Sequence, residues 1–468
     1  MQAIGSAIST EGRVFNNVGH AGNTFWAPNI NIFRDPRWGR GHETPGEDPF
    51  LSSVYATQFV RGMQEGEDDR YLKTSACCKH FAAYSVENLY NGTHRHNFDA
   101  HVTKQDMADT YLPAFEACVV KGKASALMCS YNSINGVPAC ADVGLLTGVA
   151  RERWGFDGYV TSDCGAISDI WKRHNYTDSP EGACAVALQA GCDLDCSTFY
   201  QEHCPEAMAK GMIDEGDLDK ALGHLLRVQF RLGLFDSLEE QVYTKYGLEK
   251  VNSEEHQALA LEAARQGMVL LKNEGGFLPL SVGEEEMEEV GEEEALLKTA
   301  LLRRERRERQ LHRGQRAEGV LSMAVIGPHA DAMDALLGNY QGVPPFIISP
   351  IEGLRKYVPD AVLVEGCGIN STLPGDQMSA AEAAARKADV VVLVLGLDLT
   401  IENEGVDRTS IVLPPPQVEL AGRVLEAAED GGKRVVVVLI AGGAVDVGFL
   451  KEDGRVAAMV FAGYPGKI

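Results

Sequence analysis

The stretch Gly158-Tyr159-Val160-Thr161-Ser162-Asp163-Cys164-Gly165 runs from apolar and β-branched residues into a carboxylate and then a glycine. This pattern predicts a strand that ends at Ser162, with Asp163 at the point where the strand meets a loop. On β/α scaffolds, catalytic groups gather at such strand ends. An Asp after a strand is also common as a helix cap or a turn residue. The stretch alone leaves both interpretations of Asp163 open.

Apolar runs of the same kind alternate with helical patterns over residues 1–235. The predicted strands are Phe25–Phe33, Thr74–Phe81, Ala124–Tyr131, Tyr159–Ser162 and a shorter one near Ala190–Leu194. The predicted helices include Pro49–Gly62, Lys104–Lys121 and Leu218–Leu232, and Met1–Gly5 is typical of the middle of an amphipathic helix. Alternation of strands and helices predicts a parallel sheet.

Side chains suited to chemistry follow these predicted strands. They are Arg40, Lys79, His80, Tyr131 and Asp163. A barrel collects its strand ends at one face, so residues far apart in the sequence would converge there. Each also has an ordinary alternative: Lys79 and His80 as a lysine beside a core histidine, and Arg40 in an ion pair with Asp35 or Glu43.

The second half of the chain returns to an α/β pattern after a connector. Residues 236–280 indicate a linker and a helix ending in Val269-Leu270-Leu271-Lys272-Asn273. From 321 on, the runs Met323–Gly327, Val390–Gly396, Val435–Ile440 and Val456–Phe461 predict buried parallel strands, with helices at Ala380–Ala388 and Pro416–Ala428. The turn Gly327-Pro328-His329 is not a G-x-G-x-x-G sequence, so a nucleotide-binding role has little support.

A charged segment separates the two halves. Residues 284–295 are mostly Glu, and residues 303–316 are mostly Arg, Glu and Gln. Blocks of like charge with few apolar residues are typical of a solvated helix or a disordered insert. We therefore treat 281–320 as an insert between domains rather than as part of either core.

Composition excludes several classes of partner. The 468 residues are 45% hydrophobic and 24% charged, which is ordinary for a globular protein. The formal net charge of -24 argues against nucleic acid and anionic membranes as partners. The chain has no apolar run of about 20 residues, so no membrane span is expected. Oligomeric state cannot be deduced from these features.

Ten of the 11 cysteines fall between Cys77 and Cys204. This clustering predicts local disulfides in an oxidising compartment. A metal site is disfavoured, because the sequence contains no paired C-x-x-C motif with suitable partners. N-glycosylation sequons begin at Asn91, Asn175 and Asn370, which favours secretion. No signal peptide is visible at the N-terminus of this chain.

Several longer motifs occur in one order along the chain. They are Asn29-Ile30-Asn31-Ile32-Phe33-Arg34-Asp35-Pro36-Arg37-Trp38-Gly39-Arg40-Gly41-His42-Glu43-Thr44, Cys78-Lys79-His80-Phe81, Met128-Cys129-Ser130-Tyr131-Asn132, Ser162-Asp163-Cys164-Gly165 and Glu402-Asn403-Glu404-Gly405-Val406-Asp407-Arg408. In this order they resemble glycoside hydrolase family 3, in its fungal and plant β-xylosidase branch. The resemblance covers nearly the whole chain apart from the insert.

The resemblance implies a (β/α)8-type barrel over 1–235 followed by a doubly wound α/β sandwich domain over 321–468. In that family a strand, a helix and a secretion signal would precede residue 1, and the rest of the second domain would follow residue 468. The resemblance thus implies a chain truncated at both ends, and a secreted protein. It implies no metal and no organic cofactor.

The resemblance also assigns roles. Asp163 matches the nucleophile, and Arg40, Lys79, His80, Met128 and Tyr131 match positions that line the subsite for the terminal sugar. The acid/base of this branch is a Glu on a loop of the second domain. Glu404 matches its Glu-Gly-x-Asp-Arg pattern, and Glu402 is the alternative. Retention of configuration needs two such carboxyl groups about 5–5.5 Å apart.

Two further predictions concern the loop that carries Glu404 and the branch of the family that the chain resembles. Glu402 and Glu404 are two residues apart, so on an extended loop they could face the same side, and Asp407 is expected to pair with Arg408. The hexosaminidase branch uses an Asp-His dyad on a barrel loop, where His94 and His96 stand here. No Asp-Ser-His sequence occurs there, which disfavours that branch.

The implied activity is release of β-D-xylose from the non-reducing ends of xylooligosaccharides. Family β-glucosidases usually carry Trp after the nucleophile, and Cys164 stands there instead, which fits a smaller site. An α-L-arabinofuranosidase, a β-glucosidase or a catalytically inactive sugar-binding remnant are the alternatives. Because the two acids belong to different domains, activity would depend on how the domains dock.

Overall fold

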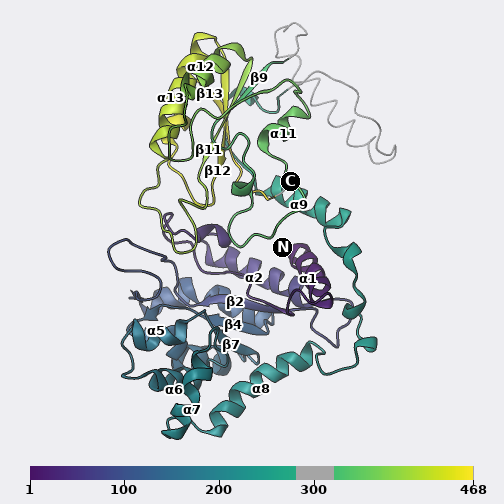
Figure 1. Ribbon diagram of the computed structural model, residues 1–468, viewed down its shortest axis with the longest axis vertical. Helices are drawn as coiled ribbons and strands as arrows, with labels where there is room; N and C mark the ends of the chain where they lie inside the picture. Colours follow the sequence, from purple (N-terminus) through teal and green to yellow (C-terminus); the bar gives the residue numbers. More distant parts are fainter. Residues whose placement is uncertain (281–320, 467–468) are drawn as a thin grey trace.

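The computed structural model describes residues 1–280 and 321–466, which form two α/β domains stacked along the long axis of the molecule (Figure 1). The charged segment that the sequence sets apart, 281–320, lies outside the described residues. Figure 1 shows helix α9 (Glu254–Gly267) running along the side of the molecule between the two domains.

The first domain is built on a parallel sheet with the strand order β1-β2-β4-β7. Its strands are β1 (Thr24–Phe25), β2 (Ser75–Phe81), β4 (Ala126–Cys129) and β7 (Tyr159–Ser162). A bridge between Thr161 and Leu194 continues the order beyond β7. The first predicted strand was too long: Pro28 lacks an N–H, and after β1 only Asn29 bridges to Lys79.

Helices pack around this sheet and give the barrel-like domain that the sequence predicted. They are α1 (Gln2–Asn17), α2 (Pro49–Gln64), α3 (Lys104–Asp106), α4 (Pro113–Glu116), α5 (Ala166–Lys172), α6 (Pro180–Ala190), α7 (Phe199–Ala209) and α8 (Glu215–Arg231). Five-residue π-helical turns continue α3 and α4, so a single helical path covers the predicted Lys104–Lys121. Two-residue strands β3 (Asp99–Ala100), β5 (Ser133–Ile134) and β6 (Val137–Pro138) form a small separate sheet.

The second domain holds a six-stranded sheet with the order β10-β9-β11-β12-β13-β8. Its strands are β8 (Val269–Asn273), β9 (Met323–Ile326), β10 (Val362–Val364), β11 (Val390–Gly396), β12 (Arg434–Ile440) and β13 (Val456–Phe461). All neighbours are parallel except β13 and β8. The end of the sequence-defined connector thus supplies an antiparallel edge strand to this sheet.

Both faces of the second sheet are covered, as a doubly wound fold requires. In β11, Val391, Leu393 and Leu395 pack in one buried apolar cluster, and the alternate residues Val390, Val392 and Val394 pack in another. The helices of this domain are α11 (Pro350–Arg355), α12 (Gln377–Lys387), α13 (Pro415–Asp430) and α14 (Gly448–Lys451). A strand buried on both faces explains the continuous Val and Leu runs in the sequence.

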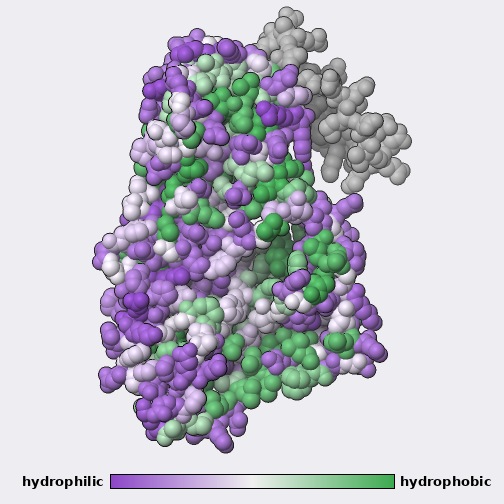
Figure 2. Space-filling model, in the orientation of Figure 1, coloured by the Kyte–Doolittle hydropathy of each residue, from purple (hydrophilic) through white to green (hydrophobic). Residues whose placement is uncertain are grey.

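Three disulfides tie the first domain together, which confirms the local pairing predicted from the cysteine clustering. They are Cys78–Cys118, Cys129–Cys140 and Cys164–Cys196. In the described part of the chain, no helix is both long and apolar enough to cross a bilayer. Exposed apolar side chains on and after α8, among them Leu222, Phe230 and Phe235, form a strip at the end of the molecule away from the second domain (Figures 1 and 2).

Candidate active site

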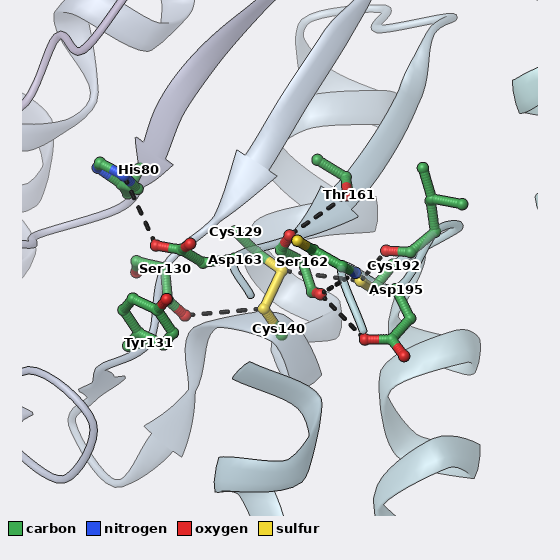
Figure 3. Close-up of a disulfide and its surroundings, with 12 residues drawn as sticks. His80, Cys129, Ser130, Tyr131, Cys140, Thr161, Ser162, Asp163, Cys192 and Asp195 are labelled. Carbon is green, nitrogen blue, oxygen red and sulfur yellow. Dashed lines mark hydrogen bonds and ion pairs between the residues drawn. A yellow bond between two sulfur atoms is a disulfide. The ribbon is translucent and has the colours of Figure 1, made fainter. Parts of the chain in front are cut away.

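Three parallel strands deliver the candidate residues to one end of the first sheet. Lys79 and His80 lie in β2, Met128 lies in β4 with Tyr131 just after it, and Asp163 follows β7 (Figure 3). The register pairs Phe81 with Cys129 and Cys129 with Ser162, so these strand ends are level with one another. Parallel pairing therefore brings together residues that are up to 84 positions apart in the sequence.

Asp163 is fixed by its backbone and keeps one carboxylate oxygen open. Its N–H donates to the Cys129 carbonyl at 3.1 Å, and its Oδ1 accepts from the Cys164 N–H at 2.8 Å. Its Oδ2 is buried and has no hydrogen-bond partner among residues 1–280 and 321–466. Burial raises the pKa of Asp163, while the Cys164 N–H and the charges of Arg40 and Lys79 oppose that rise. Oδ2 is thus a buried acceptor without a hydrogen-bond donor in the described part of the chain.

His80 packs against Asp163 as a neutral ring. Burial, together with the charges of Arg40 and Lys79, holds the pKa of His80 well below its ordinary value. Its Nδ1 lies 3.0 Å from the Asn31 Oδ1, and because an amide oxygen only accepts, Nδ1 carries the proton. Its Nε2 lies 3.6 Å from the Asp163 Oδ2, which is a packing contact for an uncharged ring (Figure 3).

Lys79 and Tyr131 flank the open carboxylate oxygen, whereas Met128 lies deeper. Burial lowers the pKa of Lys79, and its ammonium lies 4.9 Å from the ring centre of Tyr340. The Tyr131 hydroxyl donates to the Cys164 carbonyl at 3.1 Å. Met128 is buried in an apolar cluster with Cys77 and Tyr159, and its contact with the sugar stays a prediction.

Arg40 forms the ion pair with Glu43 that the sequence offered as its structural alternative, and it also reaches the second domain. Its Nε and Nη2 bind Glu43 at 2.9 Å and 2.8 Å, which is the ion pair expected of a structural arginine. Asp35 pairs with Arg37 instead. The remaining nitrogen, Nη1, lies 3.5 Å from the Glu404 Oε1 of the second domain. Arg40 therefore links the first domain to the candidate acid/base.

Glu404 points into the first domain, where cations and a hydroxyl meet it. Arg95 Nη1 contacts its Oε1 at 2.5 Å, and the Tyr340 hydroxyl donates to its Oε2 at 2.5 Å. Burial works against the ionised form of Glu404. The Tyr340 hydrogen bond and the charges of Arg40 and Arg95 outweigh burial and lower the pKa of Glu404. The free site therefore holds Glu404 as a carboxylate at neutral pH.

Glu402 faces the other way, contrary to the expectation that both glutamates could point to the same side. It is almost fully buried, and its carboxylate accepts from the Gly442 and Gly443 N–H groups and from the Tyr464 hydroxyl. The loop is not extended, because Val406 N–H donates back to the Asn403 carbonyl in a tight turn. Glu402 is thus tied to its own domain.

The expected Asp407–Arg408 pair does not form. Asp407 accepts hydrogen bonds from the backbone N–H groups of Gly39, Glu87 and Asn88, all in the first domain, at 2.8–2.9 Å. Arg408 donates to the Ala444 carbonyl and lies 3.6 Å from Glu402. Adjacent side chains of a strand-like segment point to opposite sides, which explains the separation.

Four charged and aromatic residues of the site were not identified from the sequence. Arg95, Glu87 and Tyr84 lie on the loop after β2, and Tyr340 follows β9 in the second domain. The Arg95 guanidinium that binds Glu404 lies 5.0 Å from the Tyr131 ring centre. Burial and then the charge of Asp163 raise the pKa of the Tyr131 hydroxyl, and the charge of Glu404 adds to that rise. Periodicity gives no signal for loop residues of this kind.

Several cysteines lie close to Asp163. Cys164, next to Asp163, is bonded to Cys196, and the Gly165 N–H donates to the Cys196 carbonyl. Cys192 Sγ lies 3.7 Å from the Cys129 Sγ (Figure 3). Among the described residues, Cys129, Cys140 and Cys192 alone meet the spacing of a metal-ligand group. Because Cys129 and Cys140 are bonded to each other, this trio lacks the thiolates that a metal needs.

Fold and site together define a two-domain α/β protein in which each domain contributes a carboxylate to one junction. Family models agree with this division: the glycosyl hydrolase family 3 N-terminal domain matches residues 14–228, and the family's C-terminal domain matches residues 268–468. The chain belongs to glycoside hydrolase family 3.

Similar proteins refine this assignment. The chain is 43% identical over 469 residues to β-D-xylosidase 3 of Arabidopsis thaliana, covering 100% of this chain and 55% of that protein. It is 41% identical over 470 residues to β-xylosidase/α-L-arabinofuranosidase 1 of Medicago sativa subsp. varia, again covering 100% and 55%. A solved exo-β-xylosidase, XlnD, in complex with a xylobiose aziridine probe, superposes with a TM-score of 0.87 at 35% identity, covering 100% of this chain and 55% of that chain. The chain thus spans about half the length of these relatives.

Proposed function

We propose that the chain carries the site of a retaining exo-β-xylosidase, with Asp163 as the nucleophile and Glu404 as the acid/base. The observation behind this proposal is the meeting of two acids from separate domains around Arg40, Arg95 and Tyr131. Two carboxyl groups in different environments are what a retaining glycosidase requires.

The two acids lie in different environments. Asp163 would attack the anomeric carbon through Oδ2, which is buried and has no hydrogen-bond partner among the described residues. Burial raises the pKa of Asp163, and the Cys164 N–H and the charges of Arg40 and Lys79 oppose that rise and favour the ionised form. Glu404 would protonate the leaving oxygen and then deprotonate the water that releases the sugar. Because Glu404 is ionised in the free site, bound sugar must raise its pKa, for instance by replacing the Tyr340 hydrogen bond.

The remaining polar residues would hold the sugar. Lys79, Arg40 and Arg95 present cations around the junction, and charge-assisted hydrogen bonds to hydroxyls orient a sugar strongly. On the side of Asp163, the Cys164–Cys196 disulfide forms a fixed wall in place of a broad aromatic ring. Such a wall suits a pentose, and relatives named β-xylosidases support this choice of sugar.

Hydrolysis of aryl β-xylosides tests the proposal. The chain should release the phenol, and NMR should detect β-xylose as the first-formed anomer. Asp163→Ala should abolish turnover, and added azide should restore it with formation of α-xylosyl azide. Asp157→Ala removes an exposed acid that precedes β7, at the other end of the strand from Asp163, and should leave the rate unchanged. A folded wild-type chain that hydrolyses no aryl xyloside would overturn the proposal.

A second candidate is α-L-arabinofuranosidase activity, alone or alongside the first. The Medicago relative is named for both activities. The ratio of kcat/KM for aryl α-L-arabinofuranoside and aryl β-xyloside measures the preference directly. Loss of both activities in Asp163→Ala would assign them to one site.

We further propose that the protein matures in an oxidising compartment. Three disulfides support this, since such bonds persist in secreted proteins. All three sequon asparagines, Asn91, Asn175 and Asn370, are exposed, as glycosylation requires. A shift in mass on treatment with a glycosidase specific for N-glycans would test their occupancy.

A further inference from the structure

Glu87 stands at the centre of the domain junction, although no role follows for it from the two-acid chemistry. Its side chain is 0% exposed, and its Oε1 accepts from the Trp38 Nε1–H at 2.9 Å and from the Tyr84 hydroxyl at 2.6 Å. Its Oε2 accepts from the Gly405 N–H at 3.0 Å and lies 3.4 Å from Arg95 Nη1. Every polar atom of this buried carboxylate is therefore used.

These contacts reach Glu404 from two directions. Gly405 is the residue directly after Glu404, so the Oε2 contact fixes the backbone on which Glu404 is carried. Arg95 Nη1, which Glu87 contacts, also contacts the Glu404 Oε1 at 2.5 Å. Since both oxygens touch the same nitrogen, at 2.5 Å and 3.4 Å, they lie at most 5.9 Å apart. Glu87 and Glu404 thus share a single guanidinium nitrogen.

We propose that Glu87 is a positioning residue that holds Arg95 and the Glu404 loop in place and limits how much of the Arg95 charge Glu404 receives. The inference rests on the proposed role of Glu404 as acid/base. A carboxylate near Glu404 disfavours the ionised form of Glu404, both by direct repulsion and by competing for Arg95. Glu87 therefore keeps the Glu404 proton within reach despite the cations around it.

Other groups around Glu404 favour its ionised form. Arg40, Arg95 and the Tyr340 hydroxyl all touch it, whereas Tyr131 is a neutral phenol within range of its charge. On the other side, Glu87 faces Tyr84, Arg40 and Arg95. Burial raises the pKa of Glu87, while the charge of Arg40 and the hydrogen bonds from Tyr84, the Gly405 N–H and Trp38 oppose that rise and favour its ionised form. Within the described residues, two carboxylates oppose these cations: Glu43 binds Arg40 through Nε and Nη2, and Glu87 shares Arg95 Nη1 with Glu404 itself.

The variant Glu87→Gln tests the proposal, because it removes the charge at nearly constant size. Arg95 would then form an ion pair with Glu404 alone, so the pKa of Glu404 should fall by about one unit. The alkaline limb of kcat/KM, which reports loss of the acid proton, should move to lower pH by the same amount. An aryl xyloside whose leaving group needs no proton should lose much less rate than one with a poor leaving group.

A direct titration separates this inference from the proposed activity. Carboxyl ¹³C NMR of a glutamate-labelled chain gives the Glu404 pKa, with its signal assigned by its loss in Glu404→Gln. Glu87→Gln should lower that pKa even if the wild-type chain proves inactive. The remote variant Glu429→Gln, which removes an exposed acid paired with Arg455, should leave it unchanged.

A second variant guards against failure to fold. Glu87→Asp keeps the charge but draws it back from Arg95 by about one carbon–carbon bond, so the Glu404 pKa should fall by a smaller amount in the same direction. If folded Glu87→Gln and Glu87→Asp both titrate at Glu404 as the wild type does, the proposal is wrong. If Glu87→Gln lowers the stability of the protein but leaves the pKa of Glu404 unchanged, Glu87 has only a structural role and the proposal is likewise wrong.

Discussion

Replacing Asp407 by alanine should separate the two domains without unfolding either one. The Asp407 carboxylate accepts three backbone N–H groups of the first domain, from Gly39, Glu87 and Asn88. Its own loop contains Glu404. Asp407 therefore acts as a clamp that holds the candidate acid/base against the barrel-like domain, and its loss should affect docking first.

The size of the effect follows from these three contacts. Hydrogen bonds to a charged group contribute about 1.5–3 kcal/mol each, and an unpaired buried N–H costs about 1–3 kcal/mol. Burial raises the pKa of Asp407 in spite of the three N–H donors, so part of this gain already offsets desolvation. Contacts that share one carboxylate are not additive. We therefore expect about 3 kcal/mol of lost docking free energy, or roughly a 150-fold change in the docking equilibrium.

Urea unfolding followed by two probes measures this loss. All four tryptophans lie in the first domain, and Trp38 is buried at the junction beside Glu87, so tryptophan fluorescence reports the barrel-like domain and its interface. Far-ultraviolet circular dichroism reports both domains. Asp407→Ala should change the fluorescence at lower urea than the circular dichroism, whereas the two should coincide more closely in the wild type.

A matched control distinguishes docking from domain stability. Asp376 caps α12 by accepting the Ser379 N–H, far from the junction, so Asp376→Ala should cost about 1 kcal/mol and leave the early fluorescence change absent. Coincident transitions in Asp407→Ala at the wild-type midpoint, with unchanged xylosidase activity, would refute the idea that this clamp docks the domains.

Three further changes probe the same junction. Gly39→Ala should undock the domains as Asp407→Ala does, because the added Cβ would lie 1.8 Å from the Val406 carbonyl oxygen. Gly22→Ala is the control, since a Cβ there meets nothing within 4 Å, and the urea experiment measures both variants. Glu404→Gln should lower turnover of a poor-leaving-group xyloside about 10²–10⁴-fold with little change in the unfolding midpoint, whereas Glu402→Gln should chiefly lower the midpoint. Tyr340→Phe removes a donor to the Glu404 carboxylate, so the pKa of Glu404 should rise and the alkaline limb of kcat/KM should move about one unit to higher pH, opposite to Glu87→Gln. A limb that stays in place in Tyr340→Phe would show that this hydroxyl does not influence the acid.

The sequence predicted the parts of the structure that periodicity controls. Apolar runs located strands β2, β4 and β7, and parallel pairing then brought Lys79, His80 and Asp163 to one sheet end. The same logic located β9, β11, β12 and β13 in the second domain. These elements are buried, and burial requires a regular pattern of side chains.

Loop geometry escaped prediction for a physical reason. The sequence predicts that Glu402 and Glu404 could face the same side of an extended loop, but the left-handed backbone of Gly405, at φ 80°, and the turn from Asn403 to Val406 rotate the chain. Glu402 and Glu404 consequently face different domains. The partners that fix this turn, Glu87 and Gly39, are more than 300 residues away in the sequence. No local pattern records a contact that forms only when two domains meet.

Charge around the junction is arranged so that docking and protonation depend on each other. Undocking would withdraw Glu404 from Arg40 and Arg95 together, returning its pKa toward the ordinary value while separating it from Asp163. Docking restores the cations but also brings Glu404 near the buried carboxylate of Glu87, which draws on the same Arg95 nitrogen. In the acid/base role that we propose for it, Glu404 must take up a proton before it can pass one to a leaving group, and the two cations oppose that uptake. We therefore attribute the buried acid at this position, which is costly to the stability of the junction, to that proposed role.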